Sequence, residues 1–343
     1  MRAIVNVANG GPKVLEVREK PDLTPNPNTL VIDVKASGLN FADILARKGQ
    51  YPDGPSKPCV MGYEVSGIVG SVGEEVDDQW VGKEVFAMTK FKGQAEQVEV
   101  HPEQVFIKPS TLTFEQAAAL PVNYLTAYVL LIVMGSLQSE ESVLIHNVGG
   151  GVGLAALEIA RHIGAQTYGT ASRRKHEFLA ERGLDHAIDY RNEDWYEVLM
   201  ELTAGKGVEL ITDPLGGKEW KRSYKALRST GRLGMFGISS ASTNRKGGIS
   251  GMWQMLKTVM QMPWYHPLPL LNKNRGVFGV NLGHLWHESQ KARIWMQKLL
   301  DGVGEGWINP HVDATFSFDE VAEAHRYIEQ RKNMGKVILV PHR

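Results

Sequence analysis

The chain has 343 residues and no net formal charge at pH 7, with 43% hydrophobic and 22% charged residues. It is too long for one hydrophobic core, so we expect two domains in a protein of ordinary globular composition. The balanced charge gives no indication of a nucleic-acid partner. A single cysteine excludes an intramolecular disulfide and a cysteine-rich zinc module. No apolar run approaches the roughly 18 residues that span a bilayer, so we expect a cytoplasmic protein.

Roughly the first 120 residues are predicted to form short strands separated by turns. Typical strands are Leu30–Ala36 and Gly82–Ala87, and residues such as proline, asparagine and glycine punctuate the sequence between strands. Helical patterns in this part are short. The sequence therefore predicts an antiparallel, barrel-like unit.

From about residue 123 to 240, strands and helices alternate. A strand over Ser142–His146 precedes a glycine-rich turn and a helix over Gly153–Arg161. Apolar strands that alternate with helices predict a parallel sheet covered on both faces. The further predicted strands are Gln166–Ala171, Val208–Thr212 and Arg232–Gly237, with a helix from about Lys175 to Glu181.

The part after Gly302 returns to strands and ends in a strand over Gly335–Val340. Before it, a segment at about 245–275 is rich in methionine and tryptophan. Flexible methionine and flat aromatic side chains suit irregular hydrophobic ligands, which favours a substrate lid. Core or dimer packing is a second interpretation. A lipid or membrane contact is a third, although few cations are available to anchor the segment.

The run His146–Gly153 follows a strand and opens a helix. In that position, glycines let the backbone approach a pyrophosphate, and the helix N-terminus supplies N–H donors. Gly150 and Gly153 fill the second and third glycine places of the dinucleotide-binding pattern, although the spacing is not strict. The absence of a following Gly-Lys-Ser/Thr excludes a P-loop. We therefore expect a dinucleotide at Gly150, Gly151, Val152 and Gly153.

The end of the second strand distinguishes between the two nicotinamide cofactors. An NAD enzyme places Asp or Glu there to accept from the ribose 2′-hydroxyl. Here Thr170-Ala171 leads into Ser172-Arg173-Arg174-Lys175, which has no acid and three cations. This run favours a 2′-phosphate and hence NADPH. The alternative is a basic helix start that faces water.

Several spaced motifs occur in order along the chain: Gly38–Asp43, Arg47–Pro52, Gly62–Gly67, Leu125–Tyr128, the glycine turn and Gly335–Val337. Together they resemble the zinc-independent quinone oxidoreductase branch of the medium-chain dehydrogenase/reductase superfamily. Within that branch, Asn274–Leu285 and Lys332–Lys336 are most similar to the vesicle amine transport (synaptic vesicle membrane protein) type.

The resemblance implies an α/β fold with two domains. A GroES-like antiparallel β-barrel would comprise residues 1–122 and 304–343. A Rossmann doubly wound parallel sheet would comprise residues 123–303, with the methionine- and tryptophan-rich insertion at about 245–275. It also implies a homodimer formed by pairing of the strand near 276–281, which requires a free sheet edge.

The resemblance also implies roles for individual residues. Asn40 and Thr126 would lie near the nicotinamide, and Phe278, Val280 and Asn281 would lie behind it. Ser172, Lys175 and Tyr190 would surround the 2′-phosphate. Lys336, in the terminal motif, completes the expected cofactor-binding set. Asn147 departs from the alanine that is usual at the start of the turn.

A catalytic zinc is not expected, because zinc needs sulfur or nitrogen ligands. Asn40 stands where the zinc-dependent relatives have their first catalytic cysteine, and Tyr63 stands in the histidine place. Cys59 has no second cysteine with which to form a structural site. We expect Glu64 to be a structural carboxylate and not a ligand.

Without a Lewis acid, alcohol oxidation lacks its usual activation. Hydride delivery to an electron-poor quinone or enone remains feasible when the acceptor is aligned and its developing oxyanion is stabilised. The expected catalytic residues are Asn40, Tyr51, Tyr63 and Thr126, with Asp43 nearby, and the substrate is small and hydrophobic. Each tyrosine has the alternative interpretation of a packed ring. The alternative functions are an enoyl-thioester reductase and a lipid- or membrane-associated binding protein that retains the reductase fold.

Overall fold

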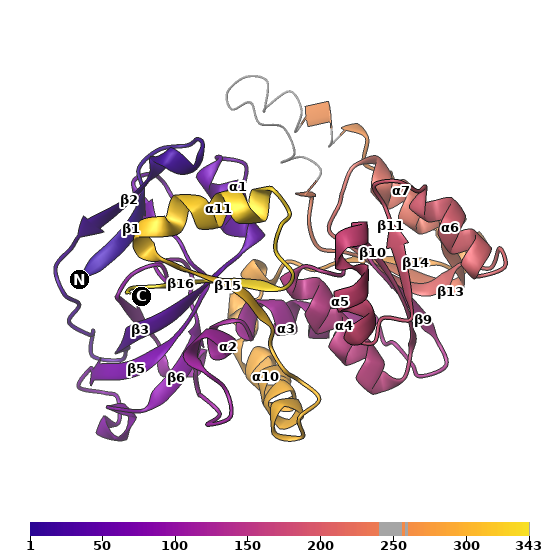
Figure 1. Ribbon diagram of the computed structural model, residues 1–343. Coiled ribbons are helices and arrows are strands. Elements are labelled where there is room, and N and C mark those ends of the chain that lie inside the picture. The colour runs from indigo at the N-terminus through magenta and orange to yellow at the C-terminus, as the bar shows by residue number, and fades with distance from the viewer. Residues whose placement is uncertain (240–255, 258–259, 343) are drawn as a thin grey trace. The chain divides into compact units, whose positions relative to one another are not determined.

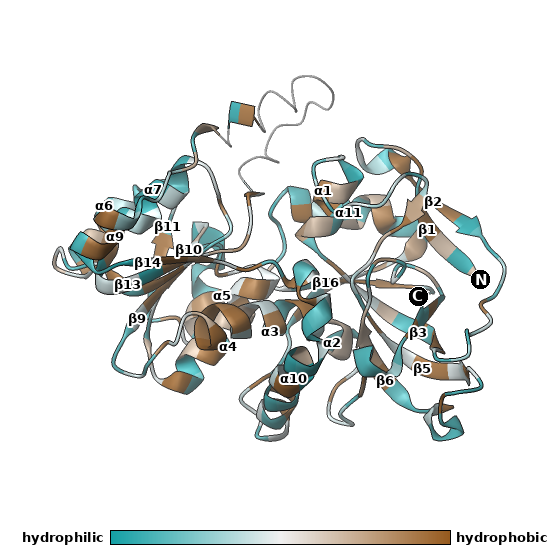
Figure 2. Ribbon diagram, turned by 180° about the vertical axis from the view of Figure 1, so that it is seen from behind, coloured by the Kyte–Doolittle hydropathy of each residue, from teal (hydrophilic) through white to brown (hydrophobic). Residues whose placement is uncertain are grey.

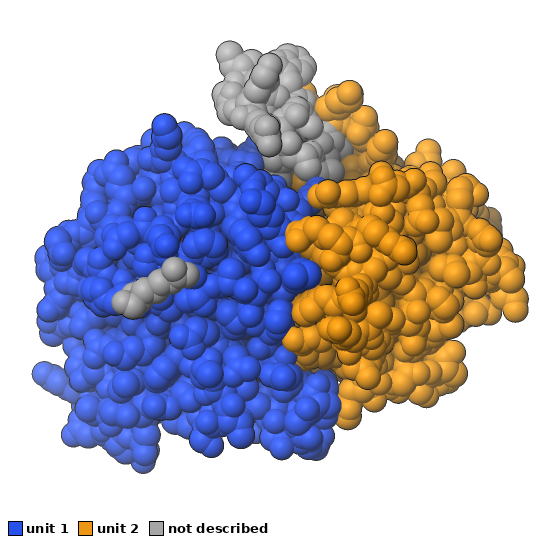
Figure 3. Space-filling model, in the orientation of Figure 1, with its two compact units in different colours: residues 1–125, 283–343 blue, residues 126–282 orange. Residues whose placement is uncertain are grey.

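The structure is a computed structural model that describes residues 1–239, 256–257 and 260–342. These residues form two compact units, shown in different colours in Figure 3. Unit 1 comprises Met1–Leu125 and Gly283–Arg343, and unit 2 comprises Thr126–Leu282. The expected boundaries were 122 and 303, so the second one differs.

The segment 283–303 belongs to unit 1 because helix α10 (Ser289–Gly304) packs on a loop of that unit. Arg293 Nη1 on α10 donates to the carbonyl oxygen of Glu103 at 2.8 Å. The same guanidinium lies 5.0 Å from the ring centre of Phe106, within range of a cation–π interaction. Helix α10 alternates teal and brown in Figure 2, as expected of an amphipathic helix.

Unit 1 is built on a seven-stranded sheet and a three-stranded sheet. The larger sheet has the order β15-β16-β3-β5-β6-β8, with β7 also on β3, and every pair except β15–β16 is antiparallel. The smaller sheet has the order β2-β1-β4. The strands are β1 (Arg2–Asn6), β2 (Leu15–Glu19), β3 (Leu30–Leu39), β4 (Cys59–Val60), β5 (Glu64–Val72), β6 (Glu84–Met88), β7 (Gln97–Val100), β8 (Val105–Ile107), β15 (Val312–Ser317) and β16 (Lys336–Val340).

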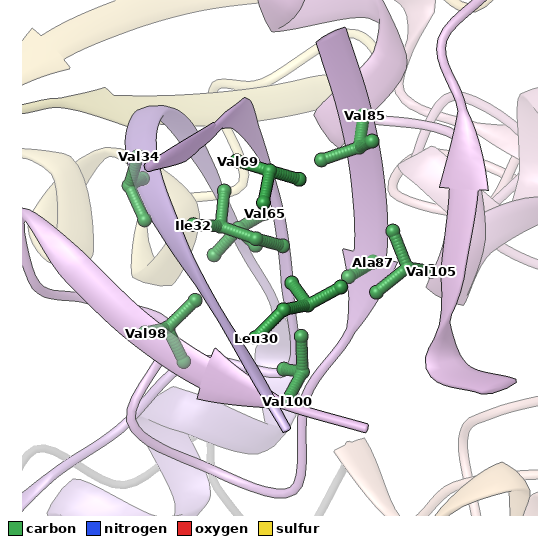
Figure 4. Packing of buried hydrophobic residues seen from close by; sticks show 10 residues of the cluster. All are labelled: Leu30, Ile32, Val34, Val65, Val69, Val85, Ala87, Val98, Val100 and Val105. Carbon is green, nitrogen blue, oxygen red and sulfur yellow. The ribbon is translucent and has the colours of Figure 1, made fainter. Parts of the chain in front are cut away.

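The core of unit 1 follows from alternation along its strands. On β3, Ile32 and Val34 are buried, whereas the intervening Asp33 is half-buried and Lys35 is exposed. Side chains at alternate positions point to the same face of a strand. Figure 4 shows the resulting cluster, in which valine, leucine and isoleucine side chains from β3, β5, β6, β7 and β8 point toward one another.

The helices of unit 1 are short apart from α10. Helix α1 begins after Asn40, whose backbone N–H donates to the carboxylate of Asp43 at 2.8 Å. This bond satisfies one of the free donors at the helix start and fixes the position of Asn40. The helices are α1 (Phe41–Arg47), α2 (Phe114–Ala118), α10 and α11 (Val321–Glu329); α3 (Pro121–Tyr128) spans the boundary between the units.

Unit 2 contains a six-stranded parallel sheet with the order β11-β10-β9-β12-β13-β14. From β9, the polypeptide adds β10 and β11 on one side of the sheet and then β12, β13 and β14 on the other side. This reversal creates a switch point at the carboxyl ends of β9 and β12. This is the topology of a doubly wound Rossmann sheet and confirms the expected fold class. The strands are β9 (Ser142–Ile145), β10 (Gln166–Ala171), β11 (His186–Asp189), β12 (Val208–Asp213), β13 (Leu227–Met235) and β14 (Gly276–Gly279).

Helices cover both faces of this sheet. In Figure 1, α4 and α5 lie on one face, and α6 and α7 lie on the other. Right-handed crossovers require this arrangement because the chain moves along the sheet in one direction up to β11 and returns from β12 onward. The helices are α4 (Gly151–Ile163), α5 (His176–Glu181), α6 (Trp195–Leu202), α7 (Lys218–Lys225) and α9 (Pro267–Lys273).

The methionine- and tryptophan-rich segment is only partly described, and Met252, Trp253 and Met255 lie outside the described residues. Within the described part, Trp264 is 94% exposed and therefore does not belong to the core of this chain. Tyr265 instead packs against Tyr224, with ring centres 5.4 Å apart. Among the helices that the structure describes, none is long and apolar enough to cross a membrane.

Candidate active site

The turn between β9 and α4 packs too closely at Gly153 to admit a side chain there. Asn147 has a φ of 55°, and its carbonyl oxygen accepts a hydrogen bond from Gly150 N at 2.9 Å. A Cβ atom on Gly153 would lie 2.5 Å from that same oxygen, closer than atoms can approach. Helix α4 therefore starts directly against the turn and directs its first free N–H groups there, as an anion-binding helix terminus does.

Lys175 lies against this turn. It ends a short 3-10 helix (Arg173–Lys175) that follows β10 and Ser172. Its side chain is buried, and its Nζ lies 3.5 Å from the carbonyl oxygen of Gly149. A Cβ on Gly149 would lie only 2.8 Å from Lys175 Cδ, so the glycine makes this close approach feasible. The cation and the helix N-terminus together suit a phosphorylated ligand.

The end of β11 adds a carboxylate near the same loop. Tyr190 directly follows Asp189, which ends the strand. Burial raises the pKa of Asp189, but hydrogen bonds from Asn192 and from the backbone of Arg191 and Arg173 outweigh that effect and lower it. Asp189 thus holds the loop that carries the cationic run. It was not among the predicted site residues.

The other predicted cofactor residues of unit 2 come from α3 and β14. Thr126 on α3 is buried. Phe278 packs on the sheet, because a Cβ added to Gly234 would lie 2.8 Å from its ring. The backbone of Val280 donates to Met235 O at 2.9 Å and continues the pairing of β14 with β13. Unit 2 therefore holds Thr126, Gly150, Gly151, Val152, Gly153, Ser172, Lys175, Tyr190, Phe278, Val280 and Asn281.

In unit 1, Asn40, Glu64 and Lys336 form one buried group. Asn40 Nδ2 donates to Glu64 Oε1 at 2.9 Å, and Asn40 Oδ1 accepts from Lys336 Nζ at 2.7 Å. Lys336 also pairs directly with Glu64. The second carboxylate oxygen of Glu64 accepts from the backbone N–H of Val122 at 2.7 Å. These contacts give Glu64 a structural role and fix the orientation of the Asn40 amide.

Lys336 therefore binds side chains of its own unit, unit 1. The glycine turn and Lys175 belong to unit 2. The ammonium of Lys336 compensates the buried charge of Glu64, an arrangement that a buried carboxylate requires. The predicted cofactor contact of Lys336 stays a prediction.

Asp43 is buried beside this group. Its two carboxylate oxygens accept from the backbone N–H groups of Asn40 at 2.8 Å and Gly62 at 3.1 Å. Burial raises the pKa of Asp43 to about 7, against the lowering effect of these hydrogen bonds and of Lys336. Its charge state therefore changes near neutral pH, which is a property common among residues at active sites.

Tyr51 and Tyr63 lie edge to face, with ring centres 6.3 Å apart, and Tyr63 also packs against Phe91 at 5.4 Å. The hydroxyl of Tyr63 is buried and makes no hydrogen bond of normal geometry. Burial raises the pKa of Tyr51, and a weak interaction between the two tyrosine hydroxyls lowers it against that effect. Burial, followed by the charge of Asp43, raises the pKa of Tyr63, so the phenol remains protonated. An unpaired buried hydroxyl of this kind is costly unless it serves a ligand.

The described residues contain no group of three or more His, Cys, Asp or Glu side chains placed to hold a metal ion. Cys59 Sγ lies 3.3 Å from Lys57 Nζ, where a cation would repel a metal. His284 pairs with Asp53 at 2.7 Å on an exposed surface.

One buried polar group near the glycine turn was not anticipated. It contains His146, which directly follows β9, together with Thr170 of β10, Asp213 of β12 and Ser223 of α7. The available signal was a polar residue at or near the carboxyl end of each of three strands. Without the strand order, nothing in the sequence indicates that these residues meet.

The similarity to known proteins extends over nearly the whole chain. The family model of the alcohol dehydrogenase GroES-like domain matches residues 26–128, and that of the zinc-binding dehydrogenase matches residues 182–339. The human synaptic vesicle membrane protein VAT-1 homolog is 36% identical over 99% of this chain and 86% of that protein.

Two solved structures illustrate the likeness in three dimensions. Escherichia coli quinone oxidoreductase complexed with NADPH matches with a TM-score of 0.87 and 29% identity, over 99% of this chain and 100% of that chain. CurK enoyl reductase matches with a TM-score of 0.84 and 28% identity, over 99% of each chain.

Proposed function

Because the chain belongs to the medium-chain dehydrogenase/reductase superfamily, in its quinone oxidoreductase-like part with the VAT-1 homologues, we propose that it is an NADPH-dependent reductase of small quinones or activated enones. The observation that carries the proposal is the glycine turn with Lys175 packed directly on it. An oxidoreductase of this general type is supported by the relatives; the cofactor and acceptor are our inference.

The residues of unit 2 fit a nicotinamide dinucleotide. Gly150, Gly151 and Gly153 let the backbone approach a pyrophosphate, which the first free N–H groups of α4 can bind, and Ser172 and Lys175 supply a hydroxyl and a cation for the 2′-phosphate. NADPH, when bound, supplies a hydride. The NADPH found in the Escherichia coli neighbour is consistent with this assignment.

In unit 1, we assign Tyr63 to the acceptor's oxygen. Its buried, unpaired hydroxyl is protonated and can donate a hydrogen bond to an oxygen on which negative charge develops. Both amide hydrogens of Asn40 are already donated, to Glu64 and to the carbonyl oxygen of Gly38, so Asn40 can offer the acceptor only the second lone pair of Oδ1. The aromatic rings of Tyr51 and Tyr63 suit a flat, apolar acceptor.

We further infer that catalysis needs no zinc. At the positions where zinc-dependent relatives have cysteine and histidine, this chain has Asn40 and Tyr63, neither of which is a ligand that zinc prefers. The remaining carboxylate, Glu64, is already paired with the ammonium of Lys336. A strong chelator should therefore leave NADPH-dependent turnover unchanged, as measured before and after dialysis with metal analysis of the protein. Loss of turnover that zinc restores would contradict this inference.

Cofactor choice can be tested by charge reversal at Lys175. We expect Lys175→Glu to weaken NADPH binding roughly 10- to 100-fold and NADH binding far less, because only NADPH carries the 2′-phosphate. Lys206→Glu is the matched control, because Lys206 is exposed and precedes β12 at the opposite end of the strand from the glycine turn. Calorimetric titration of the unmodified protein and both variants with NADPH and with NADH measures all six affinities. Equal affinity of the unmodified protein for NADPH and NADH would refute the phosphate assignment.

An enoyl-thioester reductase is the second candidate, and the structural match to CurK enoyl reductase favours it. Both reactions deliver a hydride to an electron-poor carbon, so the same turn and cation serve either. Competition separates them: an acyl-CoA enoyl thioester should inhibit quinone reduction only weakly if the acceptor is a small quinone or enone. Faster turnover of the thioester than of any free acceptor would establish the alternative.

A further inference from the structure

Four buried side chains join the carboxyl ends of three neighbouring strands in unit 2. His146, after β9, lies between Thr170 of β10 and Ser223 of α7. His146 Nδ1 lies 3.1 Å from Thr170 Oγ1, and His146 Nε2 lies 3.1 Å from Ser223 Oγ. Ser223 Oγ in turn donates to Asp213 Oδ2, at the end of β12, at 2.6 Å. None of the four is more than 3% exposed.

Counting hydrogens fixes the direction of this chain of bonds. The single hydroxyl hydrogen of Ser223 goes to Asp213, so Ser223 can only accept from His146. His146 therefore carries its hydrogen on Nε2, which leaves Nδ1 as an acceptor for the hydroxyl of Thr170. Thr170 Oγ1 also accepts the backbone N–H of Asn147 at 3.1 Å. Every donor in this series of hydrogen bonds thus points from the glycine turn toward Asp213.

Each end of this chain of hydrogen bonds holds a loop at the switch point of the sheet. At one end, Asn147 has a left-handed φ of 55°, and its carbonyl oxygen limits how closely α4 can approach. At the other end, Asp213 Oδ1 accepts from the backbone N–H of Leu215 at 2.6 Å, which holds the loop after β12. A dinucleotide binds at such a switch point in a doubly wound sheet.

The surrounding residues exclude water from this chain of hydrogen bonds and keep His146 neutral. Trp195 covers the imidazole edge to face, with ring centres 4.6 Å apart. Burial lowers the pKa of His146 to about 4, while Glu219 raises it and Arg222 lowers it further. Burial also raises the pKa of Asp213 to about 6, against hydrogen bonds from Ser223 and the following loop. Ser223 is inaccessible to any substrate, which excludes a hydrolytic Ser-His-Asp triad here.

We propose that Thr170, His146 and Ser223 are positioning residues that hold the glycine turn in the shape required by the dinucleotide, with His146 as the Nε2–H tautomer. This inference rests on the proposed function, because it assigns the turn to a nicotinamide dinucleotide. It adds residues that touch no ligand and act through the backbone N–H of Asn147. Asp213 sets the direction of the bonds by accepting the last hydrogen.

The first test is spectroscopic and needs no cofactor. Nitrogen-15 NMR of the full-length protein with labelled histidine should show His146 as a neutral Nε2–H imidazole at pH 7. Replacement of His146 by glutamine identifies its resonances. In Ser223→Ala, the Nε2–H signal should shift because its acceptor has gone. An Nδ1–H tautomer in the unmodified protein would overturn the proposal.

The second test measures NADPH affinity by calorimetry. We expect Ser223→Ala and Thr170→Val each to weaken binding roughly tenfold, because each removes a buried hydrogen bond that supports the turn. Thr212→Val is the matched control, since the hydroxyl of Thr212 is buried on the same sheet and has no partner; its affinity should equal that of the unmodified protein. If Ser223→Ala does not fold, Thr170→Val, which keeps the side chain's shape, still decides.

The outcomes separate the inference from the proposed function. An unmodified protein that binds no NADPH contradicts the proposed function and, with it, the role given to the turn. An unmodified protein that binds NADPH, together with both variants binding equally well, overturns the inference alone. Weakened binding in both variants but not in Thr212→Val supports the inference.

Discussion

The group formed by Asn40, Glu64 and Lys336 depends on each of its members. Glu64 is fully buried and Lys336 is 3% exposed, so neither charge has access to water as a substitute partner. Removing one partner of such a pair leaves an uncompensated buried charge. The orientation of the Asn40 amide, and with it the proposed acceptor contact, would be lost at the same time.

We therefore expect Lys336→Met to lower the free energy of unfolding by about 3–5 kcal/mol. The double variant Glu64→Gln/Lys336→Met should be less destabilised than Lys336→Met alone, because it removes both charges. Urea denaturation of the single and double variants measures this coupling. Lys298→Met, on an exposed position of α10, is the control and should change stability little. A double variant as unstable as the sum of the two single variants would show that the pair does not interact.

Asp43 gives a prediction about pH. Its pKa in the folded protein is about 7, raised from 3.8 by burial, so the folded state binds the proton more tightly than the unfolded state. The contribution to stability is therefore present below about pH 4 and is lost as the pH rises through 7. The carbon-13 carboxyl signal of Asp43 should titrate near pH 7. Relative to Asp43→Asn, the unmodified protein should lose stability over that range, and a signal that titrates near pH 4 would contradict this account.

At the scale of the element, the turn between β9 and α4 depends on glycine at one particular position. Gly153→Ala would place a Cβ atom 2.5 Å from the Asn147 carbonyl oxygen, which is backbone and cannot move aside cheaply. We expect this variant to lose NADPH binding more than tenfold, measured by titration, and to unfold at a lower temperature. Gly304→Ala, at the end of α10, would meet no atom within 4 Å and should change neither property. Unchanged NADPH affinity in Gly153→Ala would contradict the assigned role of the turn.

The elements that could be predicted from the sequence are those with a strong local pattern. The predicted strand Gln166–Ala171 coincides with β10, because Gly164 ends the helix before it and the polar run Ser172–Lys175 follows it. Helix α10 was not expected in unit 1, because its membership depends on long-range contacts of Arg293 with the loop at 102–105. Similarly, the glycines of the turn and the cations that follow β10 could be recognised as motifs in the sequence. The pairing of Glu64 with Lys336, across most of the chain, had no local signal.

At the scale of the whole molecule, β14 is the last strand of the parallel sheet among the residues that the structure describes. It carries neither proline nor lysine, the residues that usually protect a sheet edge from pairing with another chain. We therefore propose a homodimer in which the β14 strands of two subunits pair. Light scattering should give twice the mass of the chain. Gly276→Lys should yield monomers, because a Cβ fits there at 3.6 Å from its nearest neighbour while the two added charges would repel across the interface. An unmodified protein that is monomeric would contradict the proposal.

The central claim is that the chain transfers a hydride from NADPH to an electron-poor acceptor. The most direct measurement follows NADPH oxidation with a panel of quinones and enones, using cofactor deuterated at C4 of the nicotinamide. We predict turnover with at least one acceptor, slowed by deuterium, and deuterium at the β-carbon of a reduced enone. Tight NADPH binding without oxidation by any acceptor would contradict the claim.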